Sequence, residues 1–397
     1  MSGQRLQSLR ERTQTLFSYG YRPFFLGAAL WAAVAIALWM TMLTLGVSLP
    51  MRFDPLSWHI HEMLFGFVLA AVAGFLLTAI PEWTGRRPVR GALLALLFGL
   101  WLLGRIAAAL SALLPVALAI AADIAFPFAL AAVIARELVS ARDRRNVRMV
   151  IPVLVLALAQ LLMDLGAEGG LGGLTRYGWR LGLAAVLILV SVIGGRIVPA
   201  FTRNWLLRRG AIRLPPAAGV IDRVSLGVLH ASLIVWALFP EQRLTSLALL
   251  CAAGINFWRL LRWRTADTRA EPLLLVLHVG YAWLVAGVAA LGLAGADAAF
   301  PLSAAIHALT VGAIGSMILA VMTRATRGHS GYALSADRAT SLIYVLVVLA
   351  AAARVAAACT AHAPRVWLLI AAFLWVAAFG LFAARYMPML LRPRRGT

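Results

Sequence analysis

Twelve mostly apolar stretches follow one another along the chain, and they restrict its possible folds more than any other feature. A helix needs about 20 apolar residues to cross the hydrocarbon core of a membrane. With 62% hydrophobic and 13% charged residues, the chain is too apolar for a soluble domain. The sequence therefore predicts an all-α, polytopic membrane protein. The predicted spans are Pro23–Leu45, Ser57–Ile80, Gly91–Leu110, Pro115–Ile134, Val147–Leu165, Trp179–Val198, Gly219–Leu238, Leu244–Leu261, Pro272–Leu293, Pro301–Met322, Thr340–Ala358 and Pro364–Ala384.

The arginines indicate how these spans are oriented. The formal charge is +21, from 36 basic and 15 acidic residues. The basic residues gather in the N-terminal segment, in every second connection and in the C-terminal tail. Because short cytoplasmic loops of membrane proteins carry the excess of basic residues, both termini are predicted to be cytoplasmic. The positive charge is thus explained by topology and membrane lipid, and a nucleic-acid partner is not expected.

Three parts follow from this pattern: a cytoplasmic interfacial segment over residues 1–21, a twelve-helix domain over 22–386 and a basic tail over 387–397. Leucines and Phe17 lie among arginines in Arg5–Phe17, which favours a short interfacial helix. The pairs Thr202-Arg203 and Thr323-Arg324 resemble the end of the motif Pro81–Arg86, at nearly equal intervals. This suggests three units of four helices, although anchoring at the membrane boundary would give the same pattern.

The stretch Trp58–Gly66 opens the second span with two imidazoles and a carboxylate: His59, His61 and Glu62. Such groups are costly to bury in a membrane, so they require a metal, a haem iron or each other as partners. Since His59 and His61 point to nearly opposite faces of a helix, we expect one to bind a metal and the other to hydrogen-bond or serve a second centre. Glu62 shares a face with His59 and is suited to fixing an imidazole tautomer.

Other ionisable residues are expected at the outer side of the membrane as well. His230, His307, Arg105, Asp123 and Arg354 all fall in the outer halves of their spans. Clustering of this kind is typical of a functional cavity. For each lone histidine, the alternative is an imidazole hydrogen-bonded to a neighbouring helix.

Further histidines fall elsewhere. His278 lies near the cytoplasmic end of its span, with Tyr281 one turn later on the same face. The segment Thr326–Gly331 and His362 are expected at the surface.

A glycine follows His61 and His307 at the same distance: Gly66 and Gly312 each lie five residues later. Small residues allow either a flat macrocycle or another helix to approach the backbone. Both interpretations remain open from the sequence.

Several motifs together resemble the NnrS family. They are Tyr21–Phe25, Trp58–Met63, Pro81–Arg86, Leu277–Tyr281, and the run from His307 through Thr323-Arg324 to His329, and they cover nearly the whole chain. The resemblance implies a twelve-helix protein of the bacterial inner membrane that contains haem and copper and is associated with denitrification and resistance to nitric oxide.

The architecture is also similar to that of heme-copper oxidases, which have twelve helices and hold a low-spin haem between histidines of the second and tenth. This chain departs from them in its sixth span, Trp179–Val198, which contains no histidine and no His-Pro-Glu-Val-Tyr motif. We therefore do not expect a three-histidine copper centre or proton-pumping oxygen reduction.

The expected depth of each histidine in the membrane selects the ligands. We expect His59 or His61 together with His307 to hold the iron of haem b. His230 and His278 are reserve ligands for copper or a second haem. Arg105 and Arg354 are suited to haem propionates, with pairing to Asp123 or Glu62 as the alternative for these arginines. The polar side chains expected around the cofactors are Glu62, Asp123 and Tyr281.

The leading interpretation is a haem protein that binds or detoxifies nitric oxide or a related diatomic ligand, with an electron donor that the sequence does not identify. An alternative is an enzyme that reduces nitric oxide at a haem next to copper, which requires at least three converging histidines. A second alternative is a transporter without cofactor, whose outward-facing polar residues bind a solute or relay protons.

Overall fold

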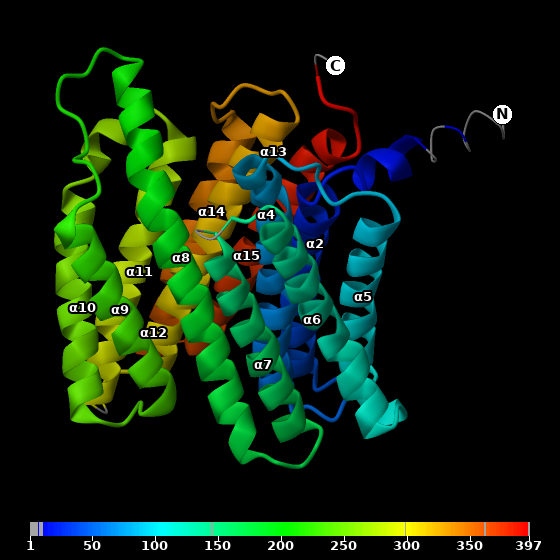
Figure 1. Cartoon of the computed structure of the whole chain (residues 1–397). Helices are drawn as coiled ribbons and strands as arrows, with labels where there is room; N and C mark the ends of the chain where they lie inside the picture. The colour runs from blue at the N-terminus through cyan, green and yellow to red at the C-terminus, as the bar shows by residue number, and fades with distance from the viewer. Residues whose placement is uncertain (1–6, 8–10, 144–145, 298, 361–362, 396–397) are drawn as a thin grey trace. The chain divides into compact units, whose positions relative to one another are not determined.

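The computed structural model describes residues 7, 11–143, 146–297, 299–360 and 363–395. Every regular element in this part of the chain is helical, and twelve helical segments are long and apolar enough to cross a membrane (Figure 1). The predicted fold class and number of spans are thus confirmed. Nine spans are single helices: α2 (Tyr21–Leu45), α5 (Ala92–Ala109), α6 (Val116–Ser140), α8 (Gly173–Leu207), α9 (Val220–Leu238), α10 (Arg243–Leu261), α11 (Pro272–Ala296), α14 (Arg338–Cys359) and α15 (Pro364–Leu390).

A short 3₁₀ turn, η3 (Val147–Met149), precedes α7 (Val150–Ala167) in the fifth span. The second and tenth spans each contain a π-helical segment. In the second, α3 (Pro55–His61) is followed by the π-helical η1 (Glu62–Val68) and by α4 (Leu69–Thr84). In the tenth, α12 (Leu302–His307) is followed by the π-helical η5 (Ala308–Gly315) and by α13 (Ser316–His329). Both π-helical segments thus begin directly after a histidine, and such segments frequently occur at functional sites.

A glycine inside each π-helical segment makes room for a tryptophan of a neighbouring helix. A Cβ added at Gly66 would lie 2.5 Å from the indole nitrogen of Trp31 on α2. A Cβ at Gly312 would lie 2.6 Å from the ring of Trp283 on α11. These two glycines therefore serve close helix packing, which is one of the two roles that the sequence left open.

Local signals explain where α3 begins. Asp54 precedes it and accepts hydrogen bonds from the backbone nitrogens of Leu56 and Ser57, both at 3.0 Å. Pro55 occupies the first helical position, where no backbone donor is needed. This cap fixes the start of the helix that carries His59 and His61.

The helices group into two compact units. Unit 1 contains the described residues up to Gly182, together with Val321–Leu334 and those from Phe379 onward; unit 2 contains Leu183–Ala320 and Ser335–Ala378. This division does not follow the boundaries of the three four-helix units suggested by the sequence, so that repeat stays a prediction.

In unit 1, the beginning and the end of the chain are joined by a buried arginine. Arg22, at the start of α2, donates from Nη1 to the backbone oxygens of Leu390 at 2.7 Å, Arg392 at 2.8 Å and Met389 at 3.4 Å. These carbonyls lie at and beyond the C-terminus of α15, where the last turn of a helix leaves its acceptors unpaired. One guanidinium therefore caps α15 and holds α2 against it.

The segment Thr326–Gly331 differs from the prediction of an exposed turn. Thr326 and Ser330 are buried, and the Ser330 hydroxyl lies 3.1 Å from the hydroxyl of Tyr21. The His329 ring lies 5.5 and 5.6 Å from the rings of Tyr19 and Tyr21. The prediction was wrong because α13 continues to His329 and packs on the start of α2, and sequence alone does not show that contact. His362 lies outside the described residues.

The ends of the predicted parts also shift. Residues 11–16 are helical, as expected for the interfacial segment, while most of Arg5–Arg10 lies outside the described residues. Helix α15 continues to Leu390, past the predicted start of the tail at residue 387. Helix α8 is longer than its predicted span at both ends. Helices commonly extend beyond the apolar core into polar surroundings, so hydropathy fixes the middle of a span better than its ends.

Candidate functional site

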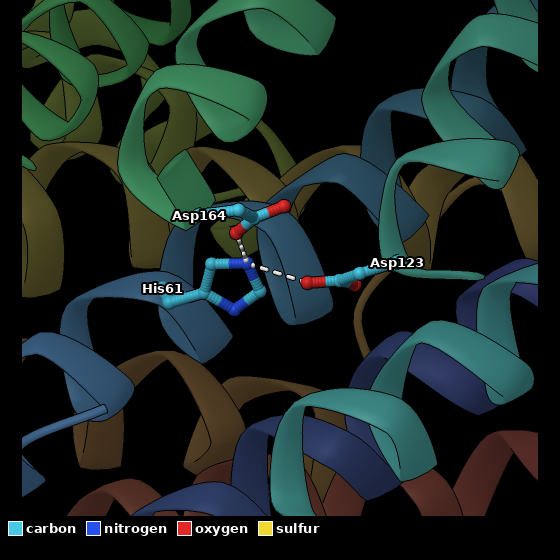
Figure 2. A group of neighbouring side chains, drawn as sticks. All are labelled: His61, Asp123 and Asp164. Carbon is cyan, nitrogen blue, oxygen red and sulfur yellow. Dashed lines mark ion pairs between the residues drawn. The ribbon is translucent and has the colours of Figure 1, made fainter. Parts of the chain in front are cut away.

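Three side chains of unit 1 converge on one buried point within the predicted outer half of the spans. His61 ends α3, Asp123 comes from α6 and Asp164 from α7. His61 Nε2 lies 2.9 Å from Asp123 Oδ2 and 3.2 Å from Asp164 Oδ1. Dashed lines mark these two ion pairs in Figure 2. One ligand atom from each residue lies within 4.8 Å of the other two. All three residues are buried, which is an expensive place for two carboxylates.

The other ring nitrogen of His61 faces a third carboxylate. Nδ1 lies 3.1 Å from Oε1 of Glu62, the first residue of η1. The second oxygen of Glu62 accepts a hydrogen bond from the indole of Trp31 at 2.7 Å. The imidazole is therefore held between Glu62 on one side and the two aspartates on the other.

Arg105 of α5 binds two of the three carboxylates of this group. Its Nη1 donates to Glu62 Oε1 at 2.6 Å, and its Nη2 donates to Asp123 Oδ1 at 2.7 Å. The side chain is 3% exposed, so both charge-assisted hydrogen bonds are shielded from water. A Cβ added at Gly104 would lie 2.6 Å from Asp123 Oδ1, so the helices approach closely here. The pairing of Arg105 with Glu62 and Asp123 is the alternative that the sequence left open beside a haem propionate.

The contacts on the aspartate side leave acceptor atoms unused. A neutral imidazole carries one N–H, which cannot serve both Nδ1 and Nε2, and Nε2 faces two carboxylates. The alignment at Nε2 is not that of a hydrogen bond, and among the described residues no donor reaches Asp123 Oδ2 or either carboxylate oxygen of Asp164. Buried acceptors are normally satisfied, so these orphaned oxygens require an explanation.

A second histidine group lies in unit 2. His307 Nδ1 lies 2.7 Å from the backbone oxygen of Ser303, one turn earlier in α12. Arg354 of α14 donates from Nη2 to the hydroxyl of the same serine at 3.1 Å. The imidazole of His307 and the guanidinium of Arg354 are therefore neighbours through Ser303. Since a carbonyl only accepts, Nδ1 of His307 carries a proton, and in the neutral ring the lone pair is on Nε2.

Comparison with protein-family models assigns the chain that carries these two groups to a family. A model of the family described as NnrS protein matches residues 15–394. The chain belongs to the NnrS family. This family is associated with the response to nitric oxide. A search of curated proteins finds no similar sequence.

The other histidines of this NnrS-family protein have local partners. His278 is buried between two hydroxyl groups, Thr202 Oγ1 at 2.9 Å from Nε2 and Thr265 Oγ1 at 3.0 Å from Nδ1. His230 Nε2 lies 2.7 Å from the hydroxyl of Ser191. These contacts fit the alternative of a histidine bonded to its neighbours better than the reserve-ligand role.

His59 and Tyr281 also differ from the expected arrangement. The His59 ring stacks on Trp39, with centroids 4.8 Å apart and planes at 17°. The carboxylate of Glu62 contacts His61, whereas its position on the helix predicted contact with His59. The hydroxyl of Tyr281 accepts from the buried Arg259 and donates to Asn256, both at 2.9 Å. Tyr281 thus belongs to an arginine network of unit 2, which includes Asp222 at 2.8 Å from Arg259.

Sequence reasoning on this NnrS-family chain missed Asp164 and its neighbours. Gln160 lies one turn before Asp164 and donates to the backbone oxygen of Asp123 at 3.2 Å. Two polar residues at i and i+4 in an apolar span were the available signal. Beyond the end of that span, burial raises the pKa of Glu168 to about 7, and the charge of Asp123 adds to this effect.

Proposed function

We propose that this protein binds nitric oxide at a haem b within its membrane helices, as part of the cellular response to nitric oxide. The observation that carries the proposal is the contact between His307 Nδ1 and the Ser303 carbonyl at 2.7 Å. Histidines that bind haem iron commonly donate their second N–H to a carbonyl, which fixes the ring and its tautomer. Family membership supports the link to nitric oxide.

The neighbouring residues suit a haem as well. Arg354, joined to Ser303 at 3.1 Å, places a guanidinium beside the imidazole, where a propionate carboxylate would be paired. Two features of unit 2 would thus serve one cofactor: an imidazole for the iron and a guanidinium for the edge of the macrocycle. Bound haem would supply an iron to which a diatomic ligand coordinates.

His61 does not fit the role of a haem ligand in this arrangement. Its Nε2 faces carboxylate oxygens at 2.9 and 3.2 Å, and these leave no space for a porphyrin on that nitrogen. Of the two histidines of the second span, His59 is therefore the better candidate. Its pairing with His307 joins residues of different units and stays a prediction.

Reduction of nitric oxide at a three-histidine copper centre has less support. Within each unit, the described residues bring no three histidines together, and the group of metal-binding side chains in unit 1 contains one histidine. We therefore favour binding of nitric oxide over turnover of the oxidase type.

The test is an absorption spectrum of the purified full-length protein. We expect a Soret band and a reduced α band that shift when nitric oxide is added. His307→Ala should remove most of the haem, whereas His230→Gln should retain it because the His230 Nε2 contacts the Ser191 hydroxyl. Wild-type protein without haem would overturn the proposal and favour a transporter. Full haem retention in H307A would overturn the ligand assignment.

A further inference from the structure

We propose that His61, Asp123 and Asp164 bind a non-haem divalent cation, of the kind that prefers nitrogen and carboxylate oxygen ligands: Fe²⁺, Mn²⁺ or Zn²⁺. Its three residues all belong to unit 1 and differ from the residues proposed for the haem. One imidazole with two carboxylates is a donor set for such ions, while Cu⁺ prefers sulfur ligands. The geometry, the charge and the unused acceptors of this group each point to a bound dication.

The geometry directs one lone pair from each residue to the same point. Glu62 Oε1 at 3.1 Å holds the Nδ1 proton of His61, so the neutral ring presents the lone pair of Nε2 to the aspartates. Asp123 and Asp164 face this nitrogen from α6 and α7 (Figure 2). A carboxylate behind a histidine that binds a metal is a recurring arrangement, because it fixes the tautomer and raises the basicity of the imidazole.

The charge of the group favours a dication. The carboxylates of Glu62, Asp123 and Asp164 stand against the single guanidinium of Arg105, which leaves a formal charge of −2 around a neutral imidazole. A divalent ion neutralises this charge completely. Protonation of His61 would neutralise only half of it. Since uncompensated charge is costly within a membrane, the divalent ion is the better match.

The unused acceptors supply an independent observation. Asp164 is 1% exposed and directed at His61, yet neither of its carboxylate oxygens has a hydrogen-bond donor among the described residues. Asp123 Oδ2 lacks a donor as well. A cation between these atoms would satisfy Asp123 Oδ2 and one oxygen of Asp164 at once, whereas one imidazole N–H cannot donate to both.

The surroundings hold the ligands in place. Arg105 binds the other oxygen of Asp123, and Gln160 donates to the Asp123 backbone oxygen at 3.2 Å. Asp123 is thereby fixed with Oδ2 directed at His61 Nε2. Arg105 also binds Glu62, so one guanidinium orients both the ligand Asp123 and the carboxylate behind the imidazole. Supporting hydrogen bonds of this kind are typical of metal-binding sites in proteins.

Metal analysis of purified full-length protein tests the proposal. We expect about one equivalent of iron, manganese or zinc per chain, because a built site of deprotonated ligands retains its ion through purification. Asp164→Asn and Asp123→Asn should each lose most of this metal. The matched control is Asp297→Asn, which alters an exposed aspartate after α11. Equal metal content in D164N and wild type, or copper as the sole metal, would overturn the assignment.

Titration with Zn²⁺ alone guards against misfolded variants. Wild-type protein stripped with a chelator should bind Zn²⁺ in a calorimeter with a stoichiometry near one, and D164N of the same monodispersity should bind at least tenfold more weakly. Stripped wild type that binds no Zn²⁺ would show that the group is a salt-bridged imidazolium instead. The haem spectrum of D164N should be unchanged, so failure of this proposal and failure of the proposed haem site give different results.

Discussion

His61 Nδ1 lies 3.1 Å from Oε1 of Glu62, although the two residues are adjacent in the chain. Neighbours at i and i+1 do not face each other on a regular α-helix. Here α3 ends at His61 and the π-helical segment η1 starts at Glu62, so the contact lies at the junction of the two segments. The carboxylate that orients the imidazole therefore comes from the next residue in the chain.

Glu62→Gln tests that contact. The substitution keeps the shape of the side chain but removes the negative charge behind the imidazole. We expect Zn²⁺ affinity to fall by roughly 10–100-fold, the usual effect of removing a supporting carboxylate from a metal site. The measurement is a Zn²⁺ titration of stripped protein, with Glu82→Gln at an exposed position as the control. Unchanged affinity in E62Q would show that Glu62 does not act through His61.

Arg105→Met tests the bridge between Glu62 and Asp123. Removing the guanidinium leaves both buried carboxylates without their cation, which typically costs about 3–5 kcal/mol. We expect a clear fall in the thermal midpoint of the detergent-solubilised protein. The measurement is size-exclusion chromatography of samples heated to a series of temperatures. The thermal midpoint of Arg105→Lys should lie between those of the wild type and R105M, because a single ammonium cannot reproduce the forked contact of the guanidinium. Arg176→Met, at an exposed position, serves as the control. If R105M and R176M have the same thermal midpoint, the prediction is wrong.

Gly66→Ala tests the close approach of α2 to η1. The new methyl group would lie 2.5 Å from Trp31 Nε1 and 2.6 Å from Glu62 Oε2, so the hydrogen bond between them must break or shift. We expect lower thermal stability and a loss of metal. Gly99→Ala is the matched control, since a Cβ there meets nothing within 4 Å. Equal stability of the two variants would argue against the packing described for Trp31.

Thr202→Val tests the assignment of His278 as a structural residue. The change removes the hydroxyl that lies 2.9 Å from Nε2 and leaves a buried imidazole nitrogen without its partner, at a cost of about 1–3 kcal/mol. Haem and metal contents should remain at wild-type levels when measured per folded protein. Thr44→Val, at an exposed site, controls for the loss of a hydroxyl. Loss of a cofactor in T202V would return His278 to the set of candidate ligands.

Arg22→Met tests the cap on α15. Three backbone oxygens, of Met389, Leu390 and Arg392, would lose a buried charged donor. Because hydrogen bonds to charged groups contribute about 1.5–3 kcal/mol each, we expect a large fall in the thermal midpoint. Limited proteolysis should also cut the C-terminal segment faster. The control is Arg12→Met at an exposed position. If R22M and R12M are cut at the same rate, Arg22 does not cap α15 as described.

The twelve spans were predictable from the sequence because hydropathy over about 20 residues is a strong and local signal. The unusual residues of the site were visible for the same reason: His61, Glu62, Arg105 and Asp123 are costly in apolar spans. Placing them all toward one side of the membrane required only topology. Their actual contacts depend on which helices pack together, and hydropathy carries no such information.

Asp164 illustrates what sequence reasoning could not find. It lies one residue before the end of the predicted span Val147–Leu165, where a carboxylate is ordinarily exposed at the membrane boundary. The helix in fact reaches Ala167, and α6 and α3 cover the side chain. The approach of Trp31 to Gly66 and of Trp283 to Gly312 was equally hidden, since it depends on which helices pack together.

The discontinuous make-up of unit 1 has a consequence for biosynthesis. The first five spans leave the ribosome early, but Arg22 finds its carbonyl partners in residues 389–392, which are synthesised 367 to 370 residues later. The helices that carry His61, Asp123 and Asp164 therefore enter the bilayer before α15 has been made, and their unit is complete only after α15 follows. A nascent chain stalled before its final helix would be inserted in the membrane and still be unfinished at its N-terminal half.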